Sequence, residues 1–154
     1  MNTPNPHPSG PARLKSLMKA AGLKSFRLDA TRRGLMYSGR TREWVIIVRL
    51  DDEWLHAYTV FCDVPREAGL RARLFEATMN ANAAGMLAKF GANSQLILEL
   101  EYRAEHLDPS VLGNLTGFLY TMAEQHYPKI FRIVSGDETL DALAETLTLP
   151  ETAS

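Results

Sequence analysis

Residues 43–61 read EWVIIVRLDDEWLHAYTVF, and this stretch decides the fold. Residues 43–50 are rich in β-branched and aromatic side chains, which favour β-strands. The acidic run DDE at 51–53 interrupts the apolar pattern, and WLHAYTVF at 54–61 resumes it. Two strand-like segments separated by such a short polar break predict an antiparallel hairpin.

The predicted hairpin is apolar on both faces. If Asp51 and Asp52 form a two-residue loop, its side chains divide into two sets. The first set is Trp44, Ile46, Val48, Leu55, Ala57, Thr59 and Phe61, and the second is Val45, Ile47, Trp54, His56, Tyr58 and Val60. A three-residue loop would exchange the partners, because a one-residue slip inverts every side chain. In either register one face can pack on helices, and a second apolar face remains.

The chain before the hairpin predicts a helix and a strand. The apolar stripe of the helix is Leu14, Leu17, Met18 and Ala21, starting near Pro11. Gly22 suits a left-handed stop, with Leu23 folding back on Met18. The alternating residues Phe26, Leu28 and Ala30 predict a half-buried strand. RRG at 32–34 allows a turn, after which LMYSG continues or restarts the strand.

The chain after the hairpin predicts two more helices with a second hairpin between them. Asp63 and Pro65 open a helix whose apolar row is Leu70, Leu74, Ala77 and Ala81. A hairpin turning at GANS, 91–94, follows, with Leu96, Leu98, Leu100 and Tyr102 on one side. Asp108 and Pro109 begin a long helix that we expect to end near Pro128. KIFRIVSG at 129–136 fits a short strand or an extended connector, and Asp137 caps a last helix at 137–147.

This order, α-β-β-β-α-β-β-α, predicts an α+β fold with an antiparallel sheet and helices on one face. Prolines at positions 4, 6 and 8 indicate a disordered tail over residues 1–10. We expect residues 11–149 to form a single domain.

The central residues carry a family resemblance. LFEATMNANAAGMLAKF, 74–90, and SQLILELEYRAEHLDPSVLGNLTGFLYTMAEQHYP, 94–128, resemble the type III secretion chaperone-like superfamily, in particular the YbjN-like bacterial proteins. In that family a helix ends in an Asn-x-x-Asn-like segment, and a Lys-Phe strand follows. Here the asparagines, Asn80 and Asn82, are closer together. The resemblance implies a non-enzymatic binding module, often a homodimer.

The bulk composition excludes several classes of protein. A formal net charge of −1 over 154 residues argues against a nucleic-acid binder. The sequence shows no secretory signal and no apolar run near the ~20 residues that cross a bilayer. We therefore expect a cytoplasmic protein with no membrane partner.

No candidate set of catalytic or metal-binding residues stands out, so we expect no enzyme, cofactor or metal site. Cys62 and His56 lie six residues apart on one predicted strand, roughly 20 Å, which is too far for a nucleophile and its base. The histidines, His7, His56, His106 and His126, lack metal-site spacing. Asn80 and Asn82 fit backbone hydrogen bonding at a helix-to-strand junction better than a chemical site.

Two candidate binding surfaces remain. A large exposed apolar face commonly marks a protein interface, so we expect a homodimer, with a protein or peptide partner as a further option. The interface candidates are Trp44, Ile47, Arg49, Trp54 and Tyr58, with Arg49 over Trp54. Intramolecular cover by residues 130–147 is the alternative. The second surface is an anion- or phosphate-binding site at Arg32, Arg33, Arg40 and Arg42, around Tyr37.

Overall fold

The computed structural model describes residues 9–136. The predicted helix at 137–147, His7 and most of the predicted tail lie outside these residues. The elements are α1 (Gly10–Ala20), β1 (Ser25–Arg27), β2 (Arg32–Ser38), β3 (Glu43–Leu50), β4 (Trp54–Asp63), α2 (Ala68–Ala84), β5 (Lys89–Ala92), β6 (Gln95–Arg103) and α3 (Pro109–Ser135). A short 3-10 turn, Ala104–His106, precedes α3.

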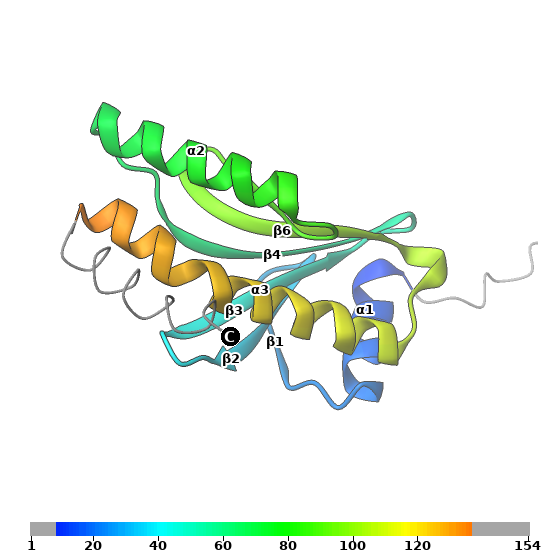
Figure 1. Ribbon diagram of the computed structural model, residues 1–154. Coiled ribbons are helices and arrows are strands. Elements are labelled where there is room, and N and C mark those ends of the chain that lie inside the picture. Colours follow the sequence, from blue (N-terminus) through cyan, green and yellow to red (C-terminus); the bar gives the residue numbers. More distant parts are fainter. Residues whose placement is uncertain (1–8, 137–154) are drawn as a thin grey trace, which may run out of the picture.

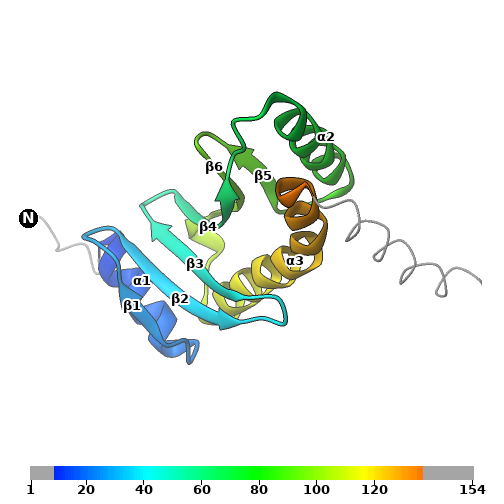
Figure 2. The ribbon, with the colours of Figure 1, turned by 90° about the vertical axis from the view of Figure 1, so that its left-hand side faces the viewer.

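The six strands form one antiparallel sheet in the order β1-β2-β3-β4-β6-β5. The helices α1, α2 and α3 pack on one face of this sheet, with α3 against β3, β4 and β6 and with α1 and α2 beside α3 (Figure 1). Figure 2 shows the sheet bending around α3, while no helix of residues 9–136 covers its opposite face. The predicted α+β class and the one-sided arrangement of the helices are confirmed.

The central hairpin keeps its predicted faces although its loop moves by one residue. Leu50 pairs with Leu55, and the Asp51 N–H donates to the Trp54 carbonyl at 3.0 Å. The two loop residues are therefore Asp52 and Glu53. A loop at Asp51 and Asp52 would have paired Leu50 with Glu53, so the partner of Leu50 changes by two residues. A change of two residues leaves each side chain on its predicted face. The helix-covered face buries Trp44, Ile46, Val48, Leu55, Ala57, Thr59 and Phe61.

The first helix ends as predicted. Gly22 has φ 73°, a left-handed conformation that favours glycine. The Leu23 N–H then donates to the Met18 carbonyl at 2.9 Å, which satisfies a carbonyl of the last turn. Leu14 and Met18 are fully buried and fix α1 on the sheet.

The predicted strand over Phe26, Leu28 and Ala30 is shorter than expected. The β1 strand ends at Arg27, and the chain turns at Asp29 before Arg32 enters β2. The Asp29 carboxylate accepts the N–H groups of Thr31 at 2.9 Å and Arg32 at 2.8 Å. The turn therefore precedes the RRG segment, and the predicted order gains one short edge strand.

The prediction that α3 ends near Pro128 is wrong. The helix continues to Ser135 and stops at Gly136, where φ is 67°. Proline removes one N–H from the ladder, but Ile130 and Ile133 beyond it are buried against the core. Their packing keeps residues 129–135 helical, so KIFRIVS is neither a strand nor a connector.

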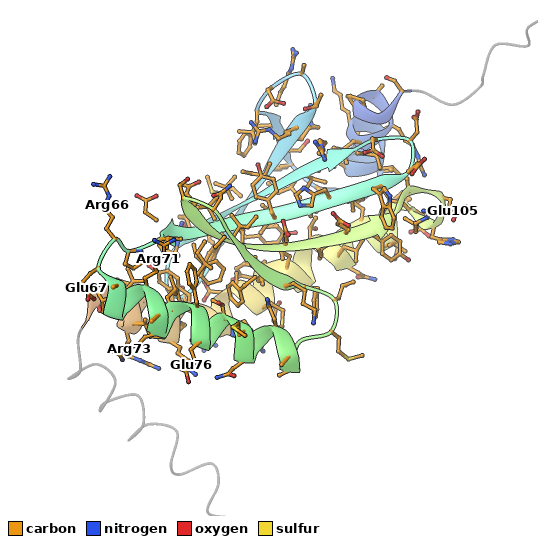
Figure 3. The ribbon with its side chains drawn as sticks, turned by 90° about the horizontal axis from the view of Figure 1, so that it is seen from above. Arg66, Glu67, Arg71, Arg73, Glu76 and Glu105 are labelled. Atoms are coloured by element: carbon orange, nitrogen blue, oxygen red, sulfur yellow. The ribbon has the colours of Figure 1, made fainter. Side chains whose placement is uncertain are left out.

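The second half of the sheet follows the predicted hairpin. Glu67 caps α2, since its carboxylate accepts the N–H groups of Gly69 at 2.8 Å and Leu70 at 2.7 Å. The helix thus starts after the predicted Asp63 and Pro65. Figure 3 shows Arg73 and Glu76 projecting from α2 away from the sheet. In β6, the predicted inward residues Leu96, Leu98 and Leu100 are buried, and Tyr102 is half-buried.

Candidate functional site: the open face of the sheet

The candidate site is the face of β2, β3, β4 and β6 that the described helices leave uncovered, here called the open face. Its residues alternate with the buried ones along each strand, and the strand register arranges them in rows. One row runs Gly34–Ile47–Tyr58–Glu99, and a second joins Met36 to Val45 and Val60 to Ile97. These two rows make the centre of the face apolar.

The apolar side chains of this centre are only partly covered. Met36 is 56% exposed, and the neighbouring valine, isoleucine and tyrosine side chains are half-buried. At the β1 edge, the Phe26 ring lies over Gly34, where an added Cβ would approach the ring to 2.5 Å. Gly34 thus lets an aromatic side chain lie flat on the sheet and extend the apolar area.

A polar row borders the apolar centre on one side. This row runs Arg32–Arg49–His56–Glu101 from β2 to β6. The His56 Nε2 lies 3.1 Å from the Glu99 carboxylate, and the His56 ring stacks on Tyr58 at 5.3 Å between centroids. The open face therefore carries arginines toward β2 and carboxylates toward β6.

Arg32 is held in place by two neighbours. Its guanidinium donates to Asp29 at 2.7 Å and to the Tyr58 hydroxyl at 2.7 Å. Hydrogen bonds from the Thr31 N–H and the Arg32 side chain lower the pKa of Asp29 to about 2. The hydrogen bond to Asp29 raises the pKa of Arg32. A shallow hollow of about 470 Å³ lies here, lined in part by Arg32, Arg49 and Tyr58.

Three of the five predicted interface residues, Ile47, Arg49 and Tyr58, lie together on the open face. Trp54 lies at its end and is 38% exposed. The cation over Trp54 is Arg103, 4.9 Å from the ring centroid, rather than the predicted Arg49. Arg103 occupies this position because it is directly opposite Trp54 in the β4–β6 pairing, a partner that the hairpin alone does not show.

The prediction is corrected at Trp44. This side chain points to the helices and is fully buried. It packs on Phe61 and Tyr127, at 5.0 and 5.3 Å between ring centroids, and donates its indole N–H to Glu124. A partner on the open face cannot touch Trp44, because even-numbered residues of β3 face the core.

The predicted arginine cluster is not a single site. Arg33 bonds to Ser25, whereas Arg42 lies over Trp44 at 4.4 Å and donates to the Phe61 carbonyl. Arg32 and Arg33 begin β2, and Arg40 and Arg42 follow its end. The extended chain from Arg33 to the end of β2 at Ser38 spans roughly 17 Å, and Arg40 lies in the loop beyond it. The anion-site prediction also placed Tyr37 among the arginines, but Tyr37 stacks on Tyr120 of α3 at 4.9 Å.

The other candidate residues have structural surroundings. Burial raises the pKa of the Cys62 thiol, with Asp63 adding to the effect, so Cys62 stays protonated at neutral pH. Asn82 bonds both backbone groups of Phe90, which confirms the predicted role at the junction with β5. Asn80 lines a hollow between α2 and α3. Within residues 9–136, no group of three His, Cys, Asp or Glu side chains is placed to hold a metal.

The sequence reasoning left Phe26, Met36, Ile97, Arg103 and Glu101 out of the site. The alternation around Leu96, Leu98 and Leu100 does assign the odd-numbered residues of β6 to the other face. Nothing local shows that β6 lies beside β4, because α2 and β5 come between them in the chain. No described helix is long and apolar enough to cross a membrane.

The arrangement of helices and strands defines the class: this is the type III secretion chaperone-like fold. A chain of the HopA1–SchA chaperone–effector complex matches with a TM-score of 0.54 and 11% identity, over 74% of this chain and 89% of that one. YbjN from E. coli matches with a TM-score of 0.52 and 12% identity, over 89% and 93% of the two chains. No protein-family model and no curated protein matches the sequence. The similarity is therefore one of fold.

Proposed function

We propose that this chain is a non-enzymatic protein-binding module of chaperone-like or regulatory type, and that it acts as a homodimer. The observation that carries the proposal is the apolar centre of the open face, where Met36, Ile47 and Tyr58 lie on a sheet with no described helix above them. Exposed apolar patches of this kind are typical of protein interfaces.

The structural neighbours support the same class of role. One belongs to a chaperone–effector complex, and the other is described as a proposed transcription regulator. Neither description is of an enzyme. In this proposal the interface comprises Ile47, Arg49, Trp54 and Tyr58, the predicted residues that lie on the open face, together with Met36.

Light scattering after size exclusion tests this proposal at micromolar concentrations. We expect the wild type to have the mass of a dimer, and Met36→Glu and Ile47→Glu to be monomeric, because each places a carboxylate in the apolar centre. Met79→Glu is the matched control, since Met79 is 71% exposed on α2. Circular dichroism verifies folding. A monomeric wild type, or a dimer that survives both open-face variants, contradicts the proposal.

A further inference from the structure

The charges of the open face are arranged so that the face complements itself. Arg32 and Arg49 lie in the polar row on the β2 and β3 side, and Glu101 lies in the same row on β6. Glu99, the other acid of β6 on this face, is already paired with His56. The apolar residues are centred between β3 and β4, with Met36 outside them on β2 and Ile97 outside them on β6.

We propose that two copies pack open face to open face, about a two-fold axis that runs parallel to the strands between β3 and β4. The inference rests on the proposed function, since it specifies how the dimer forms. Sheets that pack face to face keep their strands nearly aligned. In a two-fold interface, the contact from residue i to residue j is repeated from j to i.

This axis exchanges the two halves of every row. Ile47 of one copy then faces Tyr58 of the other, and Met36 faces Ile97, so the apolar centre is covered by apolar side chains. In the polar row, Arg32, which also bonds to Asp29 and Tyr58 of its own chain, faces Glu101 of the second copy. Arg49 faces His56 of the second copy. It lies one strand spacing from Arg32, about 4.8 Å, so its long side chain can also reach Glu101 of the second copy. Each dimer would thus contain two identical clusters of opposite charge.

When the strands of the two sheets are aligned, the alternative two-fold axis in the plane of the faces runs across the strands, and it gives a poor match. Placed through the Ile47–Tyr58 row, it exchanges the two ends of each strand, so that Arg49 faces Val45 and Glu101 faces Ile97 of the second copy. Such contacts take charges out of water without a partner, which is unfavourable. The strand register therefore selects the axis parallel to the strands.

Charge reversal at Arg49 and Glu101 tests this axis. Both side chains are exposed, and neither is needed for the hydrogen bonds that hold Arg32, Asp29 and Tyr58 together. Arg49→Glu places a second carboxylate one strand spacing from Glu101 of the other copy, and Glu101→Arg places a positive charge opposite Arg32. We expect each variant alone to raise the dimer dissociation constant about tenfold or more.

The decisive sample is an equal mixture of Arg49→Glu and Glu101→Arg. In a mixed dimer, the carboxylate introduced at position 49 of one copy lies one strand spacing from the guanidinium introduced at position 101 of the other, so that one cluster again contains both signs of charge. Light scattering and native mass spectrometry should therefore detect a heterodimer that forms with higher affinity than the homodimer of either variant. Glu76→Arg, a reversal at an exposed residue of α2 that borders the hollow between α2 and α3 and projects away from the sheet (Figure 3), should leave the dimer unchanged.

The outcomes separate the two proposals. A monomeric wild type overturns both. A dimer that Ile47→Glu breaks, but that the mixture of charge variants does not restore, overturns the axis and leaves the proposed function standing. A dimer weakened equally by Glu76→Arg also overturns the axis. Dimerisation that is weakened in each charge variant and recovered when the two are mixed supports the axis.

Discussion

Glu124 of α3 joins the helix to the loop between β2 and β3. Its carboxylate accepts the Arg40 N–H at 3.1 Å, the Thr41 hydroxyl at 2.9 Å and the indole N–H of buried Trp44. Burial acts to raise the pKa of Glu124, but these hydrogen bonds outweigh it and hold the pKa below its ordinary value. One side chain thus connects the helix-covered face of the sheet to its longest helix.

Removing this acceptor should destabilise the protein. We expect Glu124→Ala to lower the free energy of unfolding by about 1–3 kcal/mol, because the buried Trp44 N–H loses its partner. Glu124→Gln keeps an acceptor oxygen and should lose less. Urea unfolding of the two variants and the wild type measures both values. Equal losses in the two variants would show that the carboxylate charge, rather than the hydrogen bond to Trp44, is what matters.

Asp29 provides a prediction about pH. Its pKa of about 2 lies below the ordinary 3.8, chiefly because of the Thr31 N–H and then the Arg32 side chain. A lowered folded-state pKa means that its stabilising contribution is present above pH 3.8 and is lost as the pH falls toward 2. In Arg32→Gln we expect the carboxyl titration followed by NMR to move upward, yet to stay below 3.8 because the backbone donors remain. A wild-type midpoint at the ordinary value would contradict this reading of the turn.

At the scale of elements, the left-handed conformation of Gly22, which ends α1, can be tested by comparing it with a glycine inside a helix. Gly22 (φ 73°) and Gly113 within α3 both have open space where a Cβ would lie. Gly22→Ala should therefore lower the free energy of unfolding by about 1–2 kcal/mol through backbone strain alone. Gly113→Ala should raise it by roughly 0.5–1 kcal/mol, because alanine favours the helix. Thermal or urea unfolding reports both; the same sign in the two variants would rule out the strain at Gly22.

Elements whose signals are local were predictable from the sequence. The Gly22 stop, the Asp108 cap and the alternation in β3 and β6 each depend on residues within one turn or one strand. The predicted helix end at Pro128 was wrong because the helix-breaking tendency of proline competes with packing. Ile130 and Ile133 are buried in the core only when the helix continues. The arginine cluster failed for a related reason, since neighbours in sequence move apart along an extended strand.

At the scale of the whole molecule, the site depends on which strands are neighbours. The two apolar faces of the central hairpin were visible in its alternation, and the structure covers one of them with helices. The acidic half of the open face comes from β6, which reaches β4 only after the chain has passed through α2 and β5. The complementarity of charge across the face is thus a property of strand order and register, and no single segment contains it.

If two copies bury the open face, the stability of the fold depends on protein concentration. Dissociation then accompanies unfolding, so dilution should lower the Tm. With an unfolding entropy of about 2.1 cal/mol/K per residue, a tenfold dilution of a dimer of this size should lower the Tm by roughly 2–3 °C. Met36→Glu should melt at one temperature at every concentration, because its monomer has no partner to lose. Calorimetry over a concentration series measures both, and a wild-type Tm that does not change on dilution would contradict an interface on this face.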